Sequence, residues 1–138
     1  MACQNKEESN WQYIVTVDEG KNNEFKIYVE TESISRKWDE RRCTVKYVYS
    51  KEQRDNYGVY NTEINYLHIN CTDRHVWVLM RMYLDSKDEL VSGGIEQYEV
   101  GYVPTETLFG DVVTFACNSK TGWWYWLKWL GGQIISNK

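Results

Sequence analysis

Apolar and polar residues alternate through most of the first hundred positions of this 138-residue chain, and this period of two restricts the fold to one built mainly from β-strands. The alternating runs are rich in aromatic and β-branched residues and cover 11–17, 24–30, 42–49, 63–71 and 74–84. Only Thr72 and Asp73 separate the last two runs, which predicts a tight antiparallel hairpin. The polar segment 50–61 has no sustained period, so we expect a long loop there.

Helix signals replace the strand pattern near residue 104. A last short strand is expected around residues 95–100, after Gly93 and Gly94. Pro104 fits the first turn of a helix. The apolar stripe that would lie on the sheet consists of Leu108, Val112, Phe115 and Ala116. This order predicts an α+β fold, in which an antiparallel β-sheet of about six strands carries a C-terminal helix packed on one face.

The chain length favours one domain. We place that domain at residues 11–118, after a polar N-terminal spacer at 1–10 and before a Trp-rich tail at 119–138. The net charge of −4, with basic residues spread along the chain, gives no positive field for a phosphate backbone, so no nucleic-acid partner is expected.

Four cysteines allow three fully paired arrangements, and the sequence alone does not choose among them. Cys71 ends a strand pattern and Cys117 ends the helix pattern, so their positions favour a disulfide that tethers the helix to the sheet. Such a loop of roughly 45 residues would stabilise the fold by about 4 kcal/mol in the chain-entropy model, and it implies an oxidising compartment. Cys43 shares a face with Val45 and Tyr47, which favours a buried thiol.

The sequence contains no recognisable catalytic, phosphate-binding or dinucleotide-binding motif, so we predict neither enzymatic activity nor a cofactor. The two histidines, His68 and His75, stand in strand patterns without a nucleophile at a recognisable spacing. His68 and Cys71 supply at most half of a tetrahedral zinc site, so no metal site is predicted.

Aromatic residues are the candidates for a binding surface, because seven Trp and eleven Tyr favour both sheet packing and recognition. One face of the run 74–84 would hold Val76, Val78, Met80, Met82 and Leu84. The other face would hold His75, Leu79 and Arg81 with Trp77 and Tyr83, and we predict a binding surface that includes these last two. The tail adds four candidates: Trp123, Trp124, Trp126 and Trp129. Their packing on the domain, insertion at a membrane interface and docking on a partner all stay open.

The first residues, Met1, Ala2 and Cys3, are followed by a polar spacer and resemble the mature start of a bacterial lipoprotein. Cys3 is therefore a candidate lipidation site. An ordinary start with an incidental cysteine is the alternative.

The chain as a whole resembles the bacterial surface-adhesin protein E-like family over about residues 11–118. The residues that carry the resemblance are Trp11 in the first strand, Tyr28-Val29-Glu30, Ser33-Ile34, the strands 45–49 and 66–71, and Val103-Pro104 before a helix that closes at Cys117. The resemblance implies an antiparallel sheet with a C-terminal helix held on its concave face by a Cys71–Cys117 disulfide. It also implies an exported outer-membrane lipoprotein, at the cell surface or in the periplasm, with Cys3 as the lipidated residue. Three features depart from the family pattern: Tyr47 stands where Trp is common, Cys43 is extra, and the tail lies outside the shared region.

By analogy with this family, we expect a non-catalytic, adhesin-like protein-binding module. Its expected partner is a host extracellular-matrix or serum protein or another envelope protein, and a homodimer is a further assembly to consider. The alternative is a membrane-associated accessory or structural envelope protein whose Trp-rich tail docks on lipid or on another envelope component.

Overall fold

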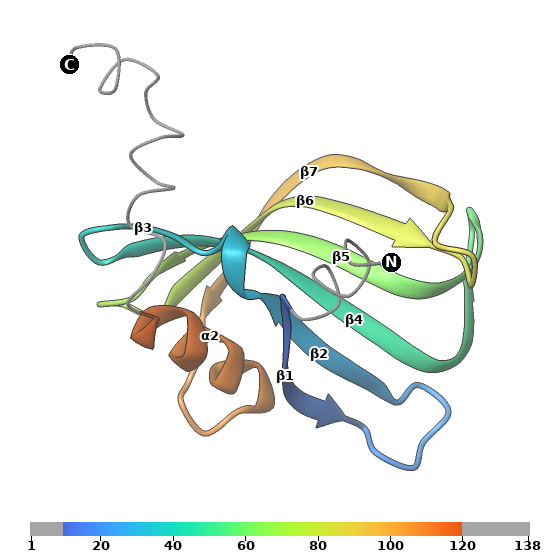
Figure 1. Cartoon of the computed structure of the whole chain (residues 1–138), viewed down its shortest axis with the longest axis horizontal. Coiled ribbons are helices and arrows are strands. Elements are labelled where there is room, and N and C mark those ends of the chain that lie inside the picture. Colours follow the sequence, from blue (N-terminus) through green and yellow to red (C-terminus); the bar gives the residue numbers. More distant parts are fainter. Residues whose placement is uncertain (1–9, 120–138) are drawn as a thin grey trace.

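All strand pairings are antiparallel in the computed structural model, which describes residues 10–119. Six strands follow one another in the order β1-β2-β4-β5-β6-β7, and the short β3 pairs with β4 (Figure 1). The strands are β1 (Trp11–Val17), β2 (Phe25–Glu30), β3 (Ser35–Lys37), β4 (Glu40–Asp55), β5 (Gly58–Asn70), β6 (His75–Leu84) and β7 (Leu90–Tyr102). One turn of 3-10 helix, η1 (Thr31–Ser33), lies between β2 and β3, and the α-helix α2 (Leu108–Asn118) comes last. The predicted α+β fold is confirmed.

The core lies between α2 and one face of the curved sheet, which we call the inner face (Figure 1). Neighbouring strands bring their apolar residues together there, because Val45 of β4 pairs with Val29 and Cys43 pairs with Leu67. The buried apolar residues are Ile27, Val29, Ile34, Cys43, Val45, Leu67, Ile69, Val76, Val78, Val103, Val112, Val113 and Ala116. Within residues 10–119, no helix is long and apolar enough to span a membrane.

The helix begins later than the sequence predicts. Thr107 is its N-cap, and the Thr107 hydroxyl accepts a hydrogen bond of 2.9 Å from the amide of Gly110. Pro104 therefore precedes the helix, and a Cβ on Gly110 would lie only 2.2 Å from the Pro104 carbonyl oxygen, so this approach requires glycine. Leu108 is 46% exposed while Val113 is fully buried, so the predicted stripe was wrong in including Leu108.

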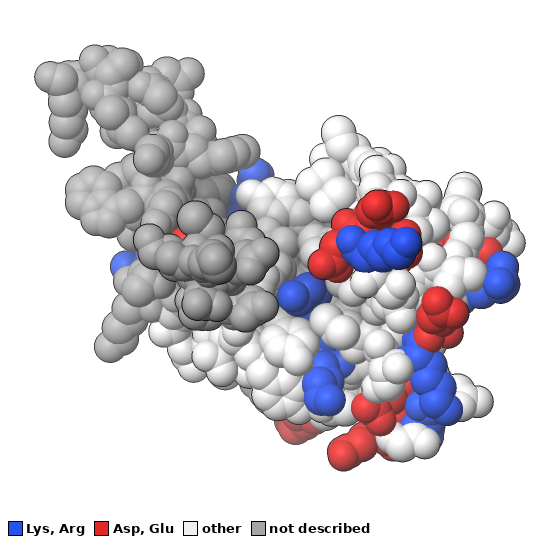
Figure 2. Space-filling view, turned by 45° about the vertical axis from the view of Figure 1, so that its right-hand side comes forward, with Lys and Arg blue, Asp and Glu red and all other residues white. Residues whose placement is uncertain are grey.

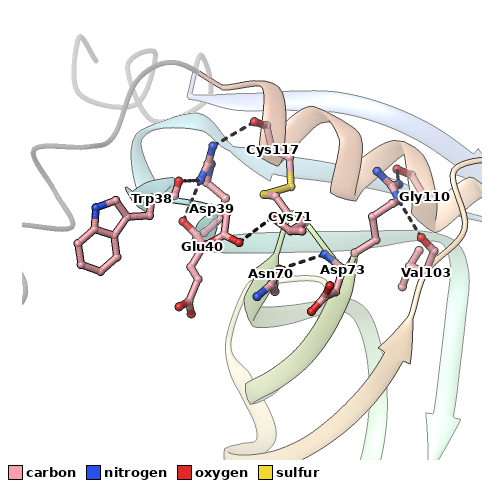
Figure 3. Close-up of a disulfide and its surroundings, with 12 residues drawn as sticks. Trp38, Asp39, Glu40, Asn70, Cys71, Asp73, Val103, Gly110 and Cys117 are labelled. Atoms are coloured by element: carbon pink, nitrogen blue, oxygen red, sulfur yellow. Dashed lines mark hydrogen bonds between the residues drawn. A yellow bond between two sulfur atoms is a disulfide. The ribbon is translucent and has the colours of Figure 1, made fainter.

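Cys71 and Cys117 form the disulfide that their positions favoured (Figure 3), with their Cα atoms 5.8 Å apart. The bond joins the end of β5 to the last turn of α2. Cys43 is a free thiol with no exposed surface, and burial raises its pKa to about 12. The predicted buried thiol is confirmed, and Cys43 is held protonated.

Two arginines attach the ends of the helix to the rest of the domain. Arg41, only 7% exposed, donates hydrogen bonds to the carbonyls of Trp38 at 2.9 Å and Cys117 at 3.2 Å. Arg74 donates to the carbonyls of Val103 and Gly110, both at 2.9 Å. A helix C-terminus presents unpaired carbonyls and a partial negative charge. Arg41 pairs with one of these carbonyls, that of Cys117, and so also holds the helix in place.

The long loop predicted at residues 50–61 was wrong. β4 continues to Asp55 and β5 starts at Gly58, so Asn56 and Tyr57 form the tip of a long hairpin. The Asp55 carboxylate accepts hydrogen bonds from the amides of Tyr57 at 2.8 Å and Gly58 at 3.1 Å, which closes the turn. The segment has no clear period in the sequence because the β4 arm is largely exposed near the tip and has no apolar face to alternate. The connection at Thr72 and Asp73 is also longer than predicted, spanning residues 71–74.

An irregularity in β6 overturns the predicted uninterrupted face of Val76, Val78, Met80, Met82 and Leu84. Leu67 pairs with Val78, but the preceding residue of β5, Tyr66, pairs with Met80, so Leu79 is an extra residue. The two faces of β6 exchange at this bulge. Trp77 consequently lies on the outer face, whereas Arg81 and Tyr83 lie on the inner face.

The expected short last strand is also longer than predicted. β7 includes Gly93 and Gly94, and it pairs with β6 along most of its length. A Cβ on Gly93 would lie 2.6 Å from the Arg81 carbonyl oxygen, so glycine is what lets β7 approach β6 there.

We predict that replacing Cys71 and Cys117 together by alanine lowers the free energy of unfolding by about 4 kcal/mol, because the unfolded chain regains the freedom that the cross-link removes. Urea denaturation of the oxidised protein measures this loss. Cys43→Ala, which removes the free buried sulfur, is the control, with an expected loss of about 1 kcal/mol. A double variant no less stable than Cys43→Ala would contradict the account.

Candidate functional site

A row of aromatic rings extends along the inner face beyond the end that α2 covers, toward the β4–β5 hairpin. Phe25 contacts Tyr47 and Tyr49, with both ring centroids 5.0 Å away. The row continues through Tyr49 and Tyr60 at 5.7 Å, and through Tyr60 and Tyr83 at 4.7 Å. Such pairs pack favourably in these tilted and edge-on arrangements. The rings thus extend the core from beneath the helix to an open part of the inner face.

A carboxylate and a guanidinium lie beside this row. Glu63 pairs across the sheet with Tyr47 on one side and Tyr83 on the other. Its carboxylate lies 3.6 Å from Nε of Arg81 and accepts a hydrogen bond of 3.0 Å from the Asn65 amide. The side chains of Glu63 and Arg81 are only 12% and 21% exposed, so this is a largely buried ion pair.

Arg81 links the ion pair to two more tyrosines. Its guanidinium donates hydrogen bonds to the hydroxyls of Tyr83, at 2.9 Å, and Tyr98. The guanidinium carbon lies 5.0 Å from the Tyr98 ring centroid, a cation–π arrangement. The Glu96 carboxylate lies 3.9 Å from Nη1. One cation therefore orients side chains from β5, β6 and β7.

Burial sets the protonation of these groups. It raises the pKa of Glu63, against the opposing effects of Asn65 and Arg81. Burial, followed by the charge of Glu63, also raises the pKa of Tyr49 and of Tyr60. The tyrosine hydroxyls therefore stay neutral and are available as hydrogen-bond donors and acceptors rather than as bases.

A cleft of about 470 Å³ opens next to this cluster, and we call it the tyrosine cleft. Its lining residues are Tyr57, Tyr83, Ser92, Gly93, Gly94, Ile95 and Glu96. The hairpin tip approaches β7 here, since a Cβ on Gly58 would lie 2.9 Å from a methyl carbon of Val91. Tyr57 and Ile95 are 75% and 81% exposed, so two large apolar side chains face solvent beside it.

Charges of both signs are interspersed around the part of the surface that faces the viewer in Figure 2, which brings the hairpin end of the molecule forward. Uncharged surface lies between them, and neither sign dominates this view. A ligand here would be selected by shape, apolar contact and hydrogen bonding more than by net charge.

The outer face carries a second, smaller hollow of about 260 Å³, lined by Arg42, His68, Trp77 and Leu79. Nδ1 of His68 accepts a hydrogen bond of 3.1 Å from Arg42, and Nε2 lies 2.5 Å from the Glu40 carboxylate. Because Nδ1 accepts, Nε2 carries the proton and donates to Glu40. Both ring nitrogens of His68 are thus engaged, and the second histidine, His75, bonds Glu99 through Nε2.

The structure does not bring the predicted binding residues together. Trp77 lies in the outer hollow between the rings of His68 and His75, while Tyr83 lines the tyrosine cleft on the opposite face. Cys3 and the four tail tryptophans, Trp123, Trp124, Trp126 and Trp129, lie outside the described residues. Binding by these residues stays a prediction.

Sequence reasoning missed Tyr57, Glu63, Arg81 and Ile95 as parts of one site. The turn sequence Asp55-Asn56-Tyr57-Gly58 is the one local signal that pointed to an exposed aromatic at a hairpin tip. Nothing local marks the bulge that turns Arg81 inward. Within residues 10–119, no three His, Cys, Asp or Glu side chains lie close enough together to hold a metal ion.

Comparison with known families gives one match. The family model described as surface-adhesin protein E matches residues 11–118. Among curated proteins, none matches the chain significantly.

Solved structures of similar fold include protein E of Haemophilus influenzae. One structure of its protein E is 14% identical, with a TM-score of 0.55, and the match covers 79% of this chain and 84% of that one. A second, of protein E from a non-typeable strain, is 14% identical with a TM-score of 0.54, covering 80% of this chain and 77% of that one. At this identity the likeness shows the shared fold.

The raised pKa of Glu63 makes the stability of this site depend on pH. Folding favours the protonated acid, so the contribution of Glu63 to the free energy of unfolding is greatest below its ordinary pKa of 4.5 and falls as pH rises through the folded-state value. Gln resembles the protonated acid and does not titrate. We predict that Glu63→Gln matches the parent in acid and becomes more stable than the parent as pH rises to neutrality, as measured by urea denaturation across pH.

Glu24→Gln is a control for which we expect the opposite dependence of stability on pH. Hydrogen bonds from the Gly20 amide and Ser50 lower the pKa of Glu24, so this variant should lose stability relative to the parent as pH rises. A pH-independent difference between Glu63→Gln and the parent would refute the burial argument.

Proposed function

Because the chain belongs to the surface-adhesin protein E family, we propose that it acts as a non-catalytic, protein-binding module at the bacterial surface and that the tyrosine cleft is its recognition surface. The family match supports the adhesin class and a cell-surface location. The location of the binding surface rests on the geometry of the inner face.

The observation that carries this proposal is the composition of the cleft and its surroundings. Tyr57, Tyr83 and Tyr98 combine large contact areas with polar hydroxyls, and tyrosine and arginine are enriched where proteins recognise other proteins. Arg81 fixes the hydroxyls of Tyr83 and Tyr98, so binding would cost little side-chain entropy there. The exposed Tyr57 and Ile95 supply apolar surface that a partner would cover.

The side chains of Glu63 and His68 are engaged by neighbours, which supports binding rather than catalysis. Glu63 is held by Arg81 and Asn65, and the nitrogens of His68 are engaged by Arg42 and Glu40. A general base needs a free lone pair directed at a substrate proton, and these groups direct theirs at neighbouring side chains.

The partner that fits this surface is a folded or extended protein segment with apolar and hydrogen-bonding groups and no strong net charge. Host extracellular-matrix and serum proteins, and other proteins of the envelope, are the partner classes we propose. The alternative, an accessory envelope protein that docks on lipid or another component through its Trp-rich tail, stays a prediction, as does homodimer formation.

We also propose that the protein is anchored in the outer membrane through a lipid on Cys3. We predict that the natural full-length protein, expressed in a bacterium that processes lipoproteins, incorporates radiolabelled palmitate and that Cys3→Ser abolishes the label. Cys43→Ser should retain it, because that thiol is buried and protonated. An unlabelled parent protein would remove the anchoring proposal.

We predict that Tyr57→Ala and Ile95→Ala each weaken capture of a matrix or serum partner by about tenfold or more, because both remove exposed apolar area at the centre of the proposed interface. Biolayer interferometry with immobilised full-length chain measures the affinity. Tyr102→Ala is the matched control, since Tyr102 is a 66% exposed aromatic on the same strand as Ile95 but outside the cleft.

Affinity that falls with Tyr102→Ala and not with the cleft variants would move the interface elsewhere on the molecule. The absence of any partner above background among matrix, serum and envelope proteins would count against the binding module itself.

A further inference from the structure

Trp38 is displayed at the tip of the hairpin that joins β3 to β4. Lys37 pairs with Glu40, so Trp38 and Asp39 form a two-residue turn. The Trp38 side chain is 79% exposed and points away from the body of the domain (Figure 3). Tryptophan is highly buried on average, so a ring this exposed is unusual.

The backbone conformation of Trp38 also works against stability. Its φ is 55°, in the left-handed region that glycine adopts readily and a bulky aromatic residue does not. Glycine or asparagine is the usual residue at this position of a two-residue hairpin turn. Trp38 is therefore a less favourable residue for this turn than glycine or asparagine would be.

Hydrogen bonds hold the tip of this hairpin in one conformation. The Trp38 carbonyl accepts a hydrogen bond of 2.9 Å from the buried Arg41. The next residue, Asp39, accepts 2.7 Å bonds from the Cys71 amide through its carbonyl and from the Thr72 hydroxyl through its carboxylate. The disulfide fixes the same corner (Figure 3). A tip this firmly held displays the ring in one direction.

The surroundings of the ring indicate what it contacts. The Lys37 ammonium lies 4.9 Å from the Trp38 ring centroid, and Arg36 precedes it on the same strand, β3, whereas Arg41 of the same hairpin is buried. Arg41 bonds the carbonyls of both Trp38 and Cys117, so the tip lies beside the end of α2. The exposed Trp38 and its basic neighbour Lys37 thus lie at the end of the molecule where α2 ends.

We propose that the Trp38 tip inserts at the headgroup region of a membrane that contains anionic phospholipid. Tryptophan concentrates at this interface because its ring is apolar and its N–H is polar, and lysine and arginine beside it attract anionic headgroups. A single projecting ring fits a soft, penetrable surface better than a protein partner, which needs a broad complementary area. The proposal is independent of the tyrosine cleft, which lies toward the opposite end of β4.

The test is flotation of the full chain with vesicles of phosphatidylethanolamine and phosphatidylglycerol, and with vesicles of phosphatidylcholine alone. We expect Trp38→Ala to reduce partitioning into the anionic vesicles by about tenfold, since the inserted ring supplies most of the local apolar area. Leu90→Ala is the control, because Leu90 is a 63% exposed apolar residue at the other end of the sheet and should bind as the parent does.

Trp38→Gly separates membrane contact from folding. Glycine suits the left-handed φ, so this variant should melt no lower than the parent and still lose vesicle binding. Unchanged flotation of Trp38→Ala or Trp38→Gly overturns the proposal, and so does a parent chain that floats with neither vesicle type. Lost capture of a protein partner with unchanged flotation would also overturn it, by assigning Trp38 to a protein interface.

Discussion

One eleven-residue helix fastened over one end of a curved sheet determines the rest of this structure. The disulfide fixes the last turn of α2, and Arg41 and Arg74 hold carbonyls at its two ends. Apolar burial alone would let so short a helix slide or detach, because it covers a small part of the inner face. The covalent bond and the two arginines give it one position, in which it packs against β1, β2 and β4.

The uncovered end of the inner face follows from this arrangement. β4 has sixteen residues, so much of its length extends beyond the helix. Tyrosines fill that region instead of aliphatic side chains, and the Glu63–Arg81 pair lies among them at a cost in desolvation that the raised pKa of Glu63 reflects. A buried charge pair that costs stability is better explained by the geometry it imposes on Tyr83 and Tyr98 than by folding. The proposed recognition of another protein would use that geometry.

Much of the fold could be predicted from the sequence, because alternation reports which face of a strand is buried and capping residues mark a helix. The strands β1 and β2, the terminal helix and the Cys71–Cys117 pair all followed from such local patterns. The candidate site could not be predicted from the sequence, because it depends on how residues of different strands pair. The bulge at Leu79 reverses the faces of β6 without a local signal, and it separates Trp77 from Tyr83, which the pattern had placed together. The hairpin at Asp55 and Gly58 was hidden because exposed strands need no apolar face.

The central claim is that the open end of the inner face recognises a protein, and hydrogen–deuterium exchange of the full chain with and without a captured matrix or serum protein tests it most directly. The account predicts slower exchange on binding in residues 56–60 and 91–98, which border the tyrosine cleft, and little change in β1 and in the outer-face segments around Arg42 and His68. Protection confined to the outer face or to β1, with the cleft segments exchanging as in the free protein, would contradict it.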